Sequence, residues 1–268
     1  MKLVPAKFAK AFNIGNKNDA ADARAIWMAT QLPSKSVAVK TAAQQAVLAL
    51  HRMRQQLVKF RTAQINGLRG LLSEYGEVMP QGRAGIKKDI AAALQRIAER
   101  LPAVLIDTLR EQYARLGELD QQILEIERRL RQWHHQDVDS QRIAEIPGVG
   151  LLTATAAVAM MGDAKAFKSG REFAAWLGLV PRQSGTGGRV RLLGISKRGD
   201  TYLRTLLIHG ARAILTHSKS PPEWLSELVK RRPRNVAVVA MANKMARTIW
   251  ALTAHERTYQ KGYVSQRA

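Results

Sequence analysis

A segment between Gly178 and Arg204, GLVPRQSGTGGRVRLLGISKRGDTYLR, combines the residue types that contact phosphodiesters. Ser184 and Thr186 supply oxygens that can bond to a phosphate or attack one. The cations that would attract a phosphate backbone are Arg182, Arg189, Arg191, Lys197 and Arg198, and the glycines that allow close backbone approach are Gly185, Gly187 and Gly188. We interpret the segment as a nucleic-acid-binding loop. The alternative is a basic surface loop followed by an ordinary helix that Asp200 caps.

A second candidate contact with phosphate is the pentapeptide Ile146-Pro147-Gly148-Val149-Gly150, which precedes a helix of small residues expected over 151–161. Two glycines two residues apart between helices form a tight turn. The backbone N–H groups of Gly148 and Gly150 can then point at a phosphate, as in helix-hairpin-helix modules. A plain turn between helices would use the same residues, but the basic composition favours the DNA-binding interpretation.

Asp19 and Asp22 stand three residues apart, and therefore on one face of a helix that begins there. Paired carboxylates on one face can hold Mg²⁺ for phosphoryl transfer. Acidic residues in a first helical turn also complement the helix dipole, and the residues alone favour that simpler interpretation.

The overall charge points to a polyanionic partner. The chain of 268 residues has 43 Lys and Arg against 21 Asp and Glu, a formal net charge of +22. Its longest apolar run, from Gly150 to Gly162, is shorter than the roughly 20 residues of a membrane span. The amino terminus lacks the apolar core of a signal peptide. We therefore expect no membrane association and a cytoplasmic, nucleoid-associated protein in a bacterium. The absence of cysteine excludes disulfides and thiolate metal sites.

Periodic apolar residues predict a mainly helical fold. Over 36–75 a heptad seam is formed by Val47, Leu50, Leu57, Leu68, Leu71 and Tyr75, with Arg54, Arg61 and Gln64 at its other positions and His51 and Arg69 outside it. A second seam over 109–133 contains Leu109, Leu116, Leu119, Ile123, Ile126, Leu130 and Trp133. Its partner is either the first helix folded back or a second chain. Further helices are expected over 171–179, with Phe173, Trp176 and Leu177 in the core, over 201–216, where Arg204 is placed to line a DNA surface, and over 236–254.

In chain order, NKNDAADARAI, the coiled-coil region, IPGVG and GLVPRQSGTGG…LLGISKRGDTYLRTLLIHGARA resemble the insertion-sequence-110 family of bacterial transposases. The resemblance covers essentially the whole chain. It implies an amino-terminal RuvC-like domain of RNase H fold with a DEDD acid set, and a carboxy-terminal domain with a catalytic serine. It also implies recombination guided by a structured RNA from the mobile element.

By this resemblance Asp19 and Asp22 are the last two acids of the DEDD set and ligate Mg²⁺. The resemblance implies that the nucleophile is Ser184, which would form a covalent bond to DNA. Thr186 is the alternative because of its spacing from Pro181, and Ser196 is a third candidate. The other two acids lie upstream in the family, whereas the 18 residues that precede Asp19 here resemble only the last strand and loop of the RuvC-like domain. We therefore expect a truncated member with an incomplete acid set and little strand transfer.

The expected architecture is mainly α. It comprises a remnant of an RNase H-like α/β domain (1–35), a coiled-coil region (36–138), a transposase domain with a helix-hairpin-helix and the basic loop (139–258), and a tail (259–268). The expected function is that of a DNA transposase or recombinase that forms a homo-oligomer, dimer or tetramer, through its coiled coil. The alternative is a non-catalytic DNA- or RNA-binding protein that dimerises in the same way. A helical scaffold without a nucleic-acid role leaves the basic cluster unexplained.

Overall fold

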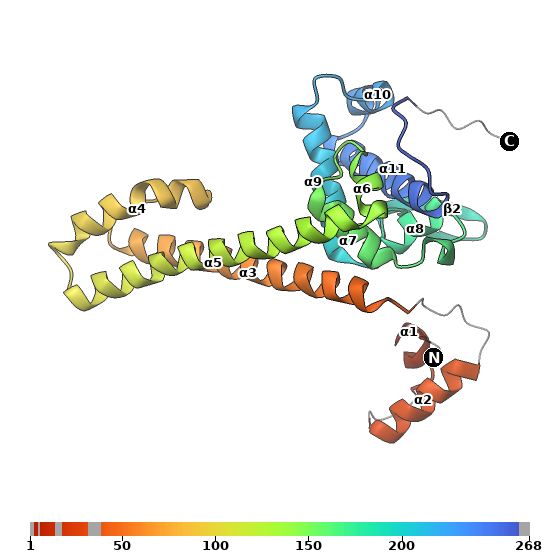
Figure 1. Ribbon diagram of the computed structural model, residues 1–268, viewed down its shortest axis with the longest axis horizontal. Coiled ribbons are helices and arrows are strands. Elements are labelled where there is room, and N and C mark those ends of the chain that lie inside the picture. Colours follow the sequence, from red (N-terminus) through yellow and green to blue (C-terminus); the bar gives the residue numbers. More distant parts are fainter. Residues whose placement is uncertain (1–2, 5, 14–17, 32–38, 263–268) are drawn as a thin grey trace. The chain divides into compact units, whose positions relative to one another are not determined.

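A computed structural model describes residues 3–4, 6–13, 18–31 and 39–262, and these residues are mainly helical (Figure 1). The chain divides into two compact units. One unit comprises residues 46–136, and the other comprises residues 1–45 together with residues 137–268. The expected mainly α class is confirmed, with one small two-stranded sheet. No helix in the described part of the chain is long and apolar enough to cross a membrane.

The unit of residues 46–136 is built from α3 (Ala42–Glu74), α4 (Gly82–Ala98) and α5 (Ala103–Gln136). Its core contains Leu68 and Leu72 of α3, Ile90 of α4 and Leu109 of α5. All are almost inaccessible to solvent. Burying such branched apolar side chains stabilises a helical bundle by roughly 1.5–3 kcal/mol each.

Polar pairs show that α3 and α5 run antiparallel, side by side in Figure 1. Arg54 donates to Glu127 at 2.8 Å, Arg61 to Asp120 at 2.8 Å and Gln64 to Gln112 at 2.7 Å. Residue numbers thus increase along α3 while those of its partners on α5 decrease, as expected of antiparallel helices. The first helix folds back on the second, which is one of the two partners expected from sequence. Burial raises the pKa of Asp120, but hydrogen bonds from Arg61 and Arg83 outweigh it and hold that pKa below its usual value.

Of the six apolar residues in the predicted first seam, two are buried, three are half-buried and one is exposed. Val47 and Leu68 are buried, whereas Leu71 is 46% exposed and its neighbour Leu72 is buried instead. His51, which was expected outside the seam, is also buried. An α-helix has 3.6 residues per turn, so its buried stripe drifts away from a strict heptad. On α5, Leu109, Leu116, Leu119, Ile123 and Leu130 are buried as predicted.

The second unit places α11 (Arg234–Ala254) at its centre. This helix packs against α9 (Thr201–His217), α8 (Gly170–Trp176), α6 (Val138–Ala144) and α10 (Glu223–Arg231). Its apolar stripe is buried as predicted: Val238, Met241, Met245, Ile249 and Leu252. The helix α7 (Leu151–Met161) packs against α6 and α9, and the short 3-10 helix η1 (Ala164–Ala166) follows it. Phe173 and Leu177 lie in the core as expected, but Trp176 is 39% exposed.

Two helices near the amino terminus, α1 (Ala6–Lys10) and α2 (Asp19–Gln31), pack against each other. By the family resemblance we expected a strand and a loop before Asp19. That expectation is wrong for residues 6–10, which are helical, while residues 1–2, 5 and 14–17 lie outside the described part of the chain. The RNase H-like character of this region stays a prediction.

Candidate nucleic-acid interface

The basic segment predicted as a loop is a β-hairpin. Its strands, β1 (Pro181–Thr186) and β2 (Arg189–Ile195), pair in antiparallel orientation. Gly187 and Gly188 form the two-residue connection with φ angles of +56° and +78°. Positive φ at both central positions is the signature of the type I′ turn, whose twist matches that of the flanking strands. A glycine pair between short runs with β-branched residues was the sequence signal for this hairpin.

The strand register gives the hairpin two different faces. Ser184 lies opposite Arg191, and Thr186 lies opposite Arg189. Because directly opposed residues and residues two apart share a face of a sheet, both hydroxyls and both guanidinium groups stand on the same face. The other face has Gln183 opposite Leu192 and Gly185 opposite Val190.

The hairpin is open to solvent along its length. Every residue of β1 is exposed, and Val190 and Leu192 of β2 are 64% and 63% exposed. Within the described chain no carboxylate forms an ion pair with Arg182, Arg189 or Arg191. Their charge is therefore available to an external anion.

Neither candidate nucleophile on the hairpin is hydrogen-bonded to a general base within the described part of the chain. Among the described residues no side chain hydrogen-bonds to the hydroxyl of Ser184 or Thr186. The third candidate, Ser196, is half-buried at the hairpin base, where its Oγ accepts from the Arg198 N–H at 3.5 Å and its own N–H donates to Val180 O at 2.8 Å. Ser184 and Thr186 are thus the accessible hydroxyls.

The base of the hairpin is fixed by close backbone approach. A Cβ on Gly199 (φ +79°) would lie 1.8 Å from the carbonyl oxygen of Trp176, so only glycine fits. The N–H of Lys197, itself at φ +53°, donates to Gly178 O at 3.1 Å. Lys197 and Arg198 remain exposed beside this joint.

Arg204 is not on the surface, contrary to the prediction that it lines a DNA surface. Its side chain is 7% exposed. The guanidinium donates to Leu177 O at 2.9 Å, to Arg198 O at 3.0 Å and to Thr201 Oγ1 at 3.2 Å. These bonds join α8, the hairpin base and α9, so Arg204 positions the hairpin. Asp200 caps α9 as predicted, with its side chain accepting from the Leu203 N–H at 2.8 Å.

The turn 146–150 connects α6 to α7, and its two glycines differ in surroundings. Gly148 has φ +82° and lies against Gly210 of α9, where a Cβ on either residue would come within 2.0–2.8 Å of the other's carbonyl oxygen. Gly150 is exposed at the start of α7. The Cα of Gly148 thus packs against the protein, and Gly150 is the more accessible of the two to a ligand.

The aspartate pair lies at the start of α2. The side chain of Asn18, which precedes the helix, accepts a hydrogen bond from the Ala21 N–H in the first turn at 2.7 Å. Asp19 is exposed, and Asp22 is half-buried and accepts a hydrogen bond from Asn13. Among the described residues no group of three or more acidic, histidine or cysteine side chains is placed to hold a metal ion. The pair by itself does not form a complete Mg²⁺ site.

Comparison with known proteins identifies the family. Residues 140–226, which include the glycine turn, the hairpin and α9, match the transposase domain of the IS116/IS110/IS902 family. A probable family 20 transposase of Pseudomonas aeruginosa is 45% identical over 98% of this chain and 79% of its own length. The transposase for IS1111A of Coxiella burnetii is 43% identical over 97% of this chain and 73% of its own length. The transposase for IS1328 of Yersinia enterocolitica is 40% identical over 97% of this chain and 79% of its own length. The chain belongs to this family.

Membership in an insertion-sequence transposase family implies DNA as a partner. The described residues fit that partner at one place in particular. The family match spans the hairpin, whose hydroxyls and unneutralised guanidinium groups share a face.

Proposed function

We propose that the hairpin β1–β2 is the strand-transfer centre of this transposase, with Ser184 as the nucleophile and Thr186 as the alternative. The observation on which the proposal rests is the strand register, which sets Ser184 opposite Arg191 and Thr186 opposite Arg189. A phosphodiester bound to the two guanidinium groups would lie next to both hydroxyls. Bidentate guanidinium–phosphate pairs are among the strong, directional hydrogen-bonded contacts in proteins.

The proposed reaction is a transesterification. The serine oxygen bonds to phosphorus, the bond from phosphorus to the leaving strand's oxygen breaks, and that oxygen takes up a proton in place of the one that serine loses. The covalent phosphoserine keeps the energy of the phosphodiester, so a second DNA hydroxyl can reverse the exchange on another strand. Arg189 and Arg191 would stabilise the charge that develops on the phosphoryl oxygens.

A contribution from Mg²⁺ is also proposed. Asp19 and Asp22 would supply two carboxylates to an ion whose other ligands come from outside the described residues, such as substrate phosphates or a second chain. When bound, the ion would neutralise phosphate charge. Because the described residues do not complete the site, no step of the proposed reaction is assigned to it. Guidance by an element-encoded RNA, and assembly of a dimer or tetramer through α3 and α5, belong to the same proposal.

The second candidate function is nucleic-acid binding without strand transfer. Two observations favour it: Asp19 and Asp22 have no third acidic ligand among the described residues, and no described base hydrogen-bonds to the hydroxyl of Ser184 or Thr186. Under this alternative the exposed hairpin cations bind DNA or RNA, and the chain competes with an active transposase.

A covalent-adduct assay separates the two functions. The full chain is incubated with labelled DNA of the element end, element RNA and Mg²⁺, then run on a denaturing gel. We expect a protease-sensitive adduct that disappears in Ser184→Ala and persists in the control Ser73→Ala, whose exposed serine lies on α3, outside the hairpin. Loss in Thr186→Val alone would assign the threonine. An adduct that survives in the double variant Ser184→Ala/Thr186→Val would contradict the assignment of the nucleophile to the hairpin. Binding of DNA by the wild-type chain without any adduct would favour the second function.

A further inference from the structure

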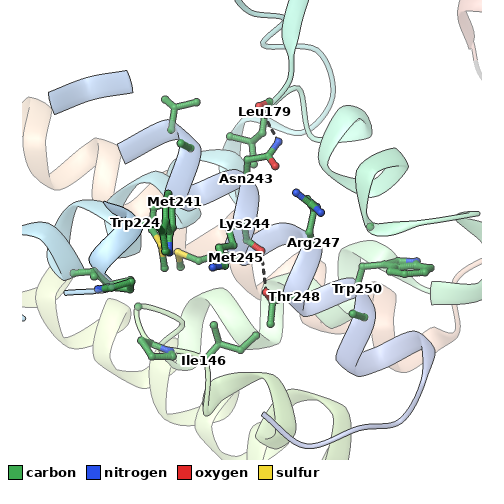
Figure 2. A pocket seen from close by; sticks show the side chains of 18 of the residues that line it. Ile146, Leu179, Trp224, Met241, Asn243, Lys244, Met245, Arg247, Thr248 and Trp250 are labelled. Atoms are coloured by element: carbon green, nitrogen blue, oxygen red, sulfur yellow. Dashed lines mark hydrogen bonds between the residues drawn. The ribbon is translucent and has the colours of Figure 1, made fainter. Parts of the chain in front are cut away.

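A groove of about 2950 Å³ runs along α11 in the same unit as the hairpin (Figure 2). Pockets for small molecules are typically about 300–1,000 Å³. The groove is therefore several times larger than a metabolite needs and suits a length of polymer. Its walls include Pro181 and residues 193–195, which belong to the hairpin strands, so it begins where the hairpin leaves the helical domain.

Cations line this groove. Lys244 and Arg247 of α11 and Arg171 of α8 all border it and are exposed, and Figure 2 shows Lys244 and Arg247 on the groove-lining helix. Within the described residues none of the three has a carboxylate in ion-pairing distance. The lining holds five Lys and Arg residues (Arg171, Lys244, Arg247, Arg257 and Lys261) and two acids, Glu223 and Glu256. The charge is complementary to a polyanion.

Apolar and aromatic side chains line the groove between these cations. Leu193 and Val236 are among them and are 39% and 50% exposed, and the Nζ of Lys244 lies 4.7 Å from the ring centroid of Trp224. The indole Nε1 of Trp224 is buried and has no hydrogen-bond partner among the described residues. A duplex presents phosphates and hides its base faces, whereas a single strand presents both phosphates and apolar base faces. The mixed lining matches the single strand.

We propose that this groove binds the single-stranded DNA that adjoins the phosphate held by the hairpin. Lys244, Arg247 and Arg171 contact its phosphates, and its bases lie on the apolar lining. The inference rests on the proposed function for its choice of DNA, because the groove is continuous with the hairpin base. It adds a binding surface that is separate from the hydroxyls and guanidinium groups of the hairpin.

The first test measures affinity for a labelled single-stranded DNA oligonucleotide by fluorescence anisotropy of the full chain at two salt concentrations. We expect Lys244→Ala/Arg247→Ala to weaken binding about tenfold and to reduce the salt slope by about 1.4, because each of the two lost phosphate contacts on a single strand contributes about 0.7. The matched control is Arg212→Ala/Lys219→Ala, which removes two exposed cations outside the groove. An equal loss in both variants would overturn the proposal.

The second test uses the absence of cysteine to place a single thiol. Thr248 lines the groove and Thr205 lies on the exposed surface of α9, and each hydroxyl bonds to the carbonyl four residues earlier. Thr248→Cys and Thr205→Cys thus match in hydrogen bonding, and because Thr248 is half-buried and Thr205 exposed, each variant is compared with itself in the presence and absence of DNA. We expect single-stranded DNA to slow maleimide labelling at position 248 at least fivefold and to leave position 205 unchanged. Equal rates with and without DNA at position 248 would contradict the proposal.

Repeating the labelling assay with other nucleic acids identifies the occupant of the groove, and repeating both assays on the hairpin and groove variants separates this inference from the proposed function. Stronger protection by single-stranded RNA or by duplex DNA would overturn the choice of single-stranded DNA. In Ser184→Ala/Thr186→Val the groove protection should persist while the covalent adduct is lost. If instead the adduct forms normally in Lys244→Ala/Arg247→Ala and DNA does not protect position 248, strand transfer stands and the groove inference fails.

Discussion

Arg191 and Arg204 have the same guanidinium group in opposite surroundings. Arg191 stands exposed on the hairpin beside Ser184, with no described carboxylate nearby, so its charge is available to a phosphate. Arg204 is 7% exposed and is held by two carbonyl oxygens and a hydroxyl. A buried cation is tolerated only when its donors are satisfied, and here they are used to fix the hairpin base. One residue type thus offers an unpaired charge to an external anion at Arg191 and positions the hairpin base at Arg204.

His51 makes the stability of the protein depend on pH. Its imidazole is 2% exposed, and burial, with a smaller effect from Arg54, lowers its pKa from 6.5 to about 4. As the pH falls below 6.5, the unfolded chain takes up this proton before the folded chain does. The stabilising effect is complete above pH 6.5 and is lost progressively as the pH falls toward 4.

We expect the wild-type protein to lose about 2 kcal/mol more of its unfolding free energy between pH 7 and pH 5 than His51→Gln, whose amide does not titrate. Urea denaturation of both proteins at the two pH values measures the difference. Parallel pH dependence of the two proteins would show that another group is responsible.

Sequence reasoning predicted local roles well and remote ones poorly. Asp200 was recognised as a cap because its partner, the N–H of Leu203, lies three residues away. The partners of Arg204 include Leu177 O, 27 residues earlier, and no local sequence pattern predicts such a contact. The burial of His51 was missed for the same reason, because the sequence pattern shows only that His51 lies next to the predicted heptad seam.

At the level of elements, helices were easier to predict than the hairpin. The stripe of α11 was predicted because core contacts repeat with the helical period. The hairpin was interpreted as a loop because all of β1 is exposed, so no buried alternation marks it as a strand. Its turn glycines, Gly187 and Gly188, were the remaining signal. The antiparallel pairing of α3 with α5 was left open because a seam does not specify which helix covers it.

Contact between Gly148 and Gly210 joins the turn 146–150 to α9 and predicts an unusual effect of a small substitution. A Cβ on Gly210 would lie 2.0 Å from the carbonyl oxygen of Gly148, and backbone must move to admit it. We expect Gly210→Ala to lower the unfolding free energy by about 1–3 kcal/mol, because overpacking outweighs the better helix propensity of alanine.

Gly117 of α5 provides the control for this substitution. It too lies inside a long helix, but a Cβ there would meet nothing within 4 Å. Gly117→Ala should therefore raise the unfolding free energy by about 0.5–1 kcal/mol. Thermal and urea unfolding of both variants would measure the contrast, and a stabilised Gly210→Ala would show that the turn does not press on α9.

Across the whole molecule, the net charge of +22 matters through its placement. Arg110, Arg128 and Arg129 on α5 each lie 3.0–3.1 Å from a carboxylate of the same helix. No described carboxylate pairs with the hairpin residues Arg182, Arg189 and Arg191. Both triads are exposed to solvent and contribute equally to net charge, but only one offers charge without a competing anion.

This difference predicts that two variants of equal net charge bind DNA differently. Replacing the hairpin triad with Gln should reduce the slope of log affinity against log salt by about 2 to 3, since each lost phosphate contact on duplex DNA removes about 0.9. Replacing the α5 triad with Gln should change the slope by less than about 1, because those cations already neutralise carboxylates. Titration of labelled DNA across salt concentrations gives both slopes. Equal slopes would mean that DNA responds to net charge alone, and that the unneutralised guanidinium groups of the hairpin are not the contact surface.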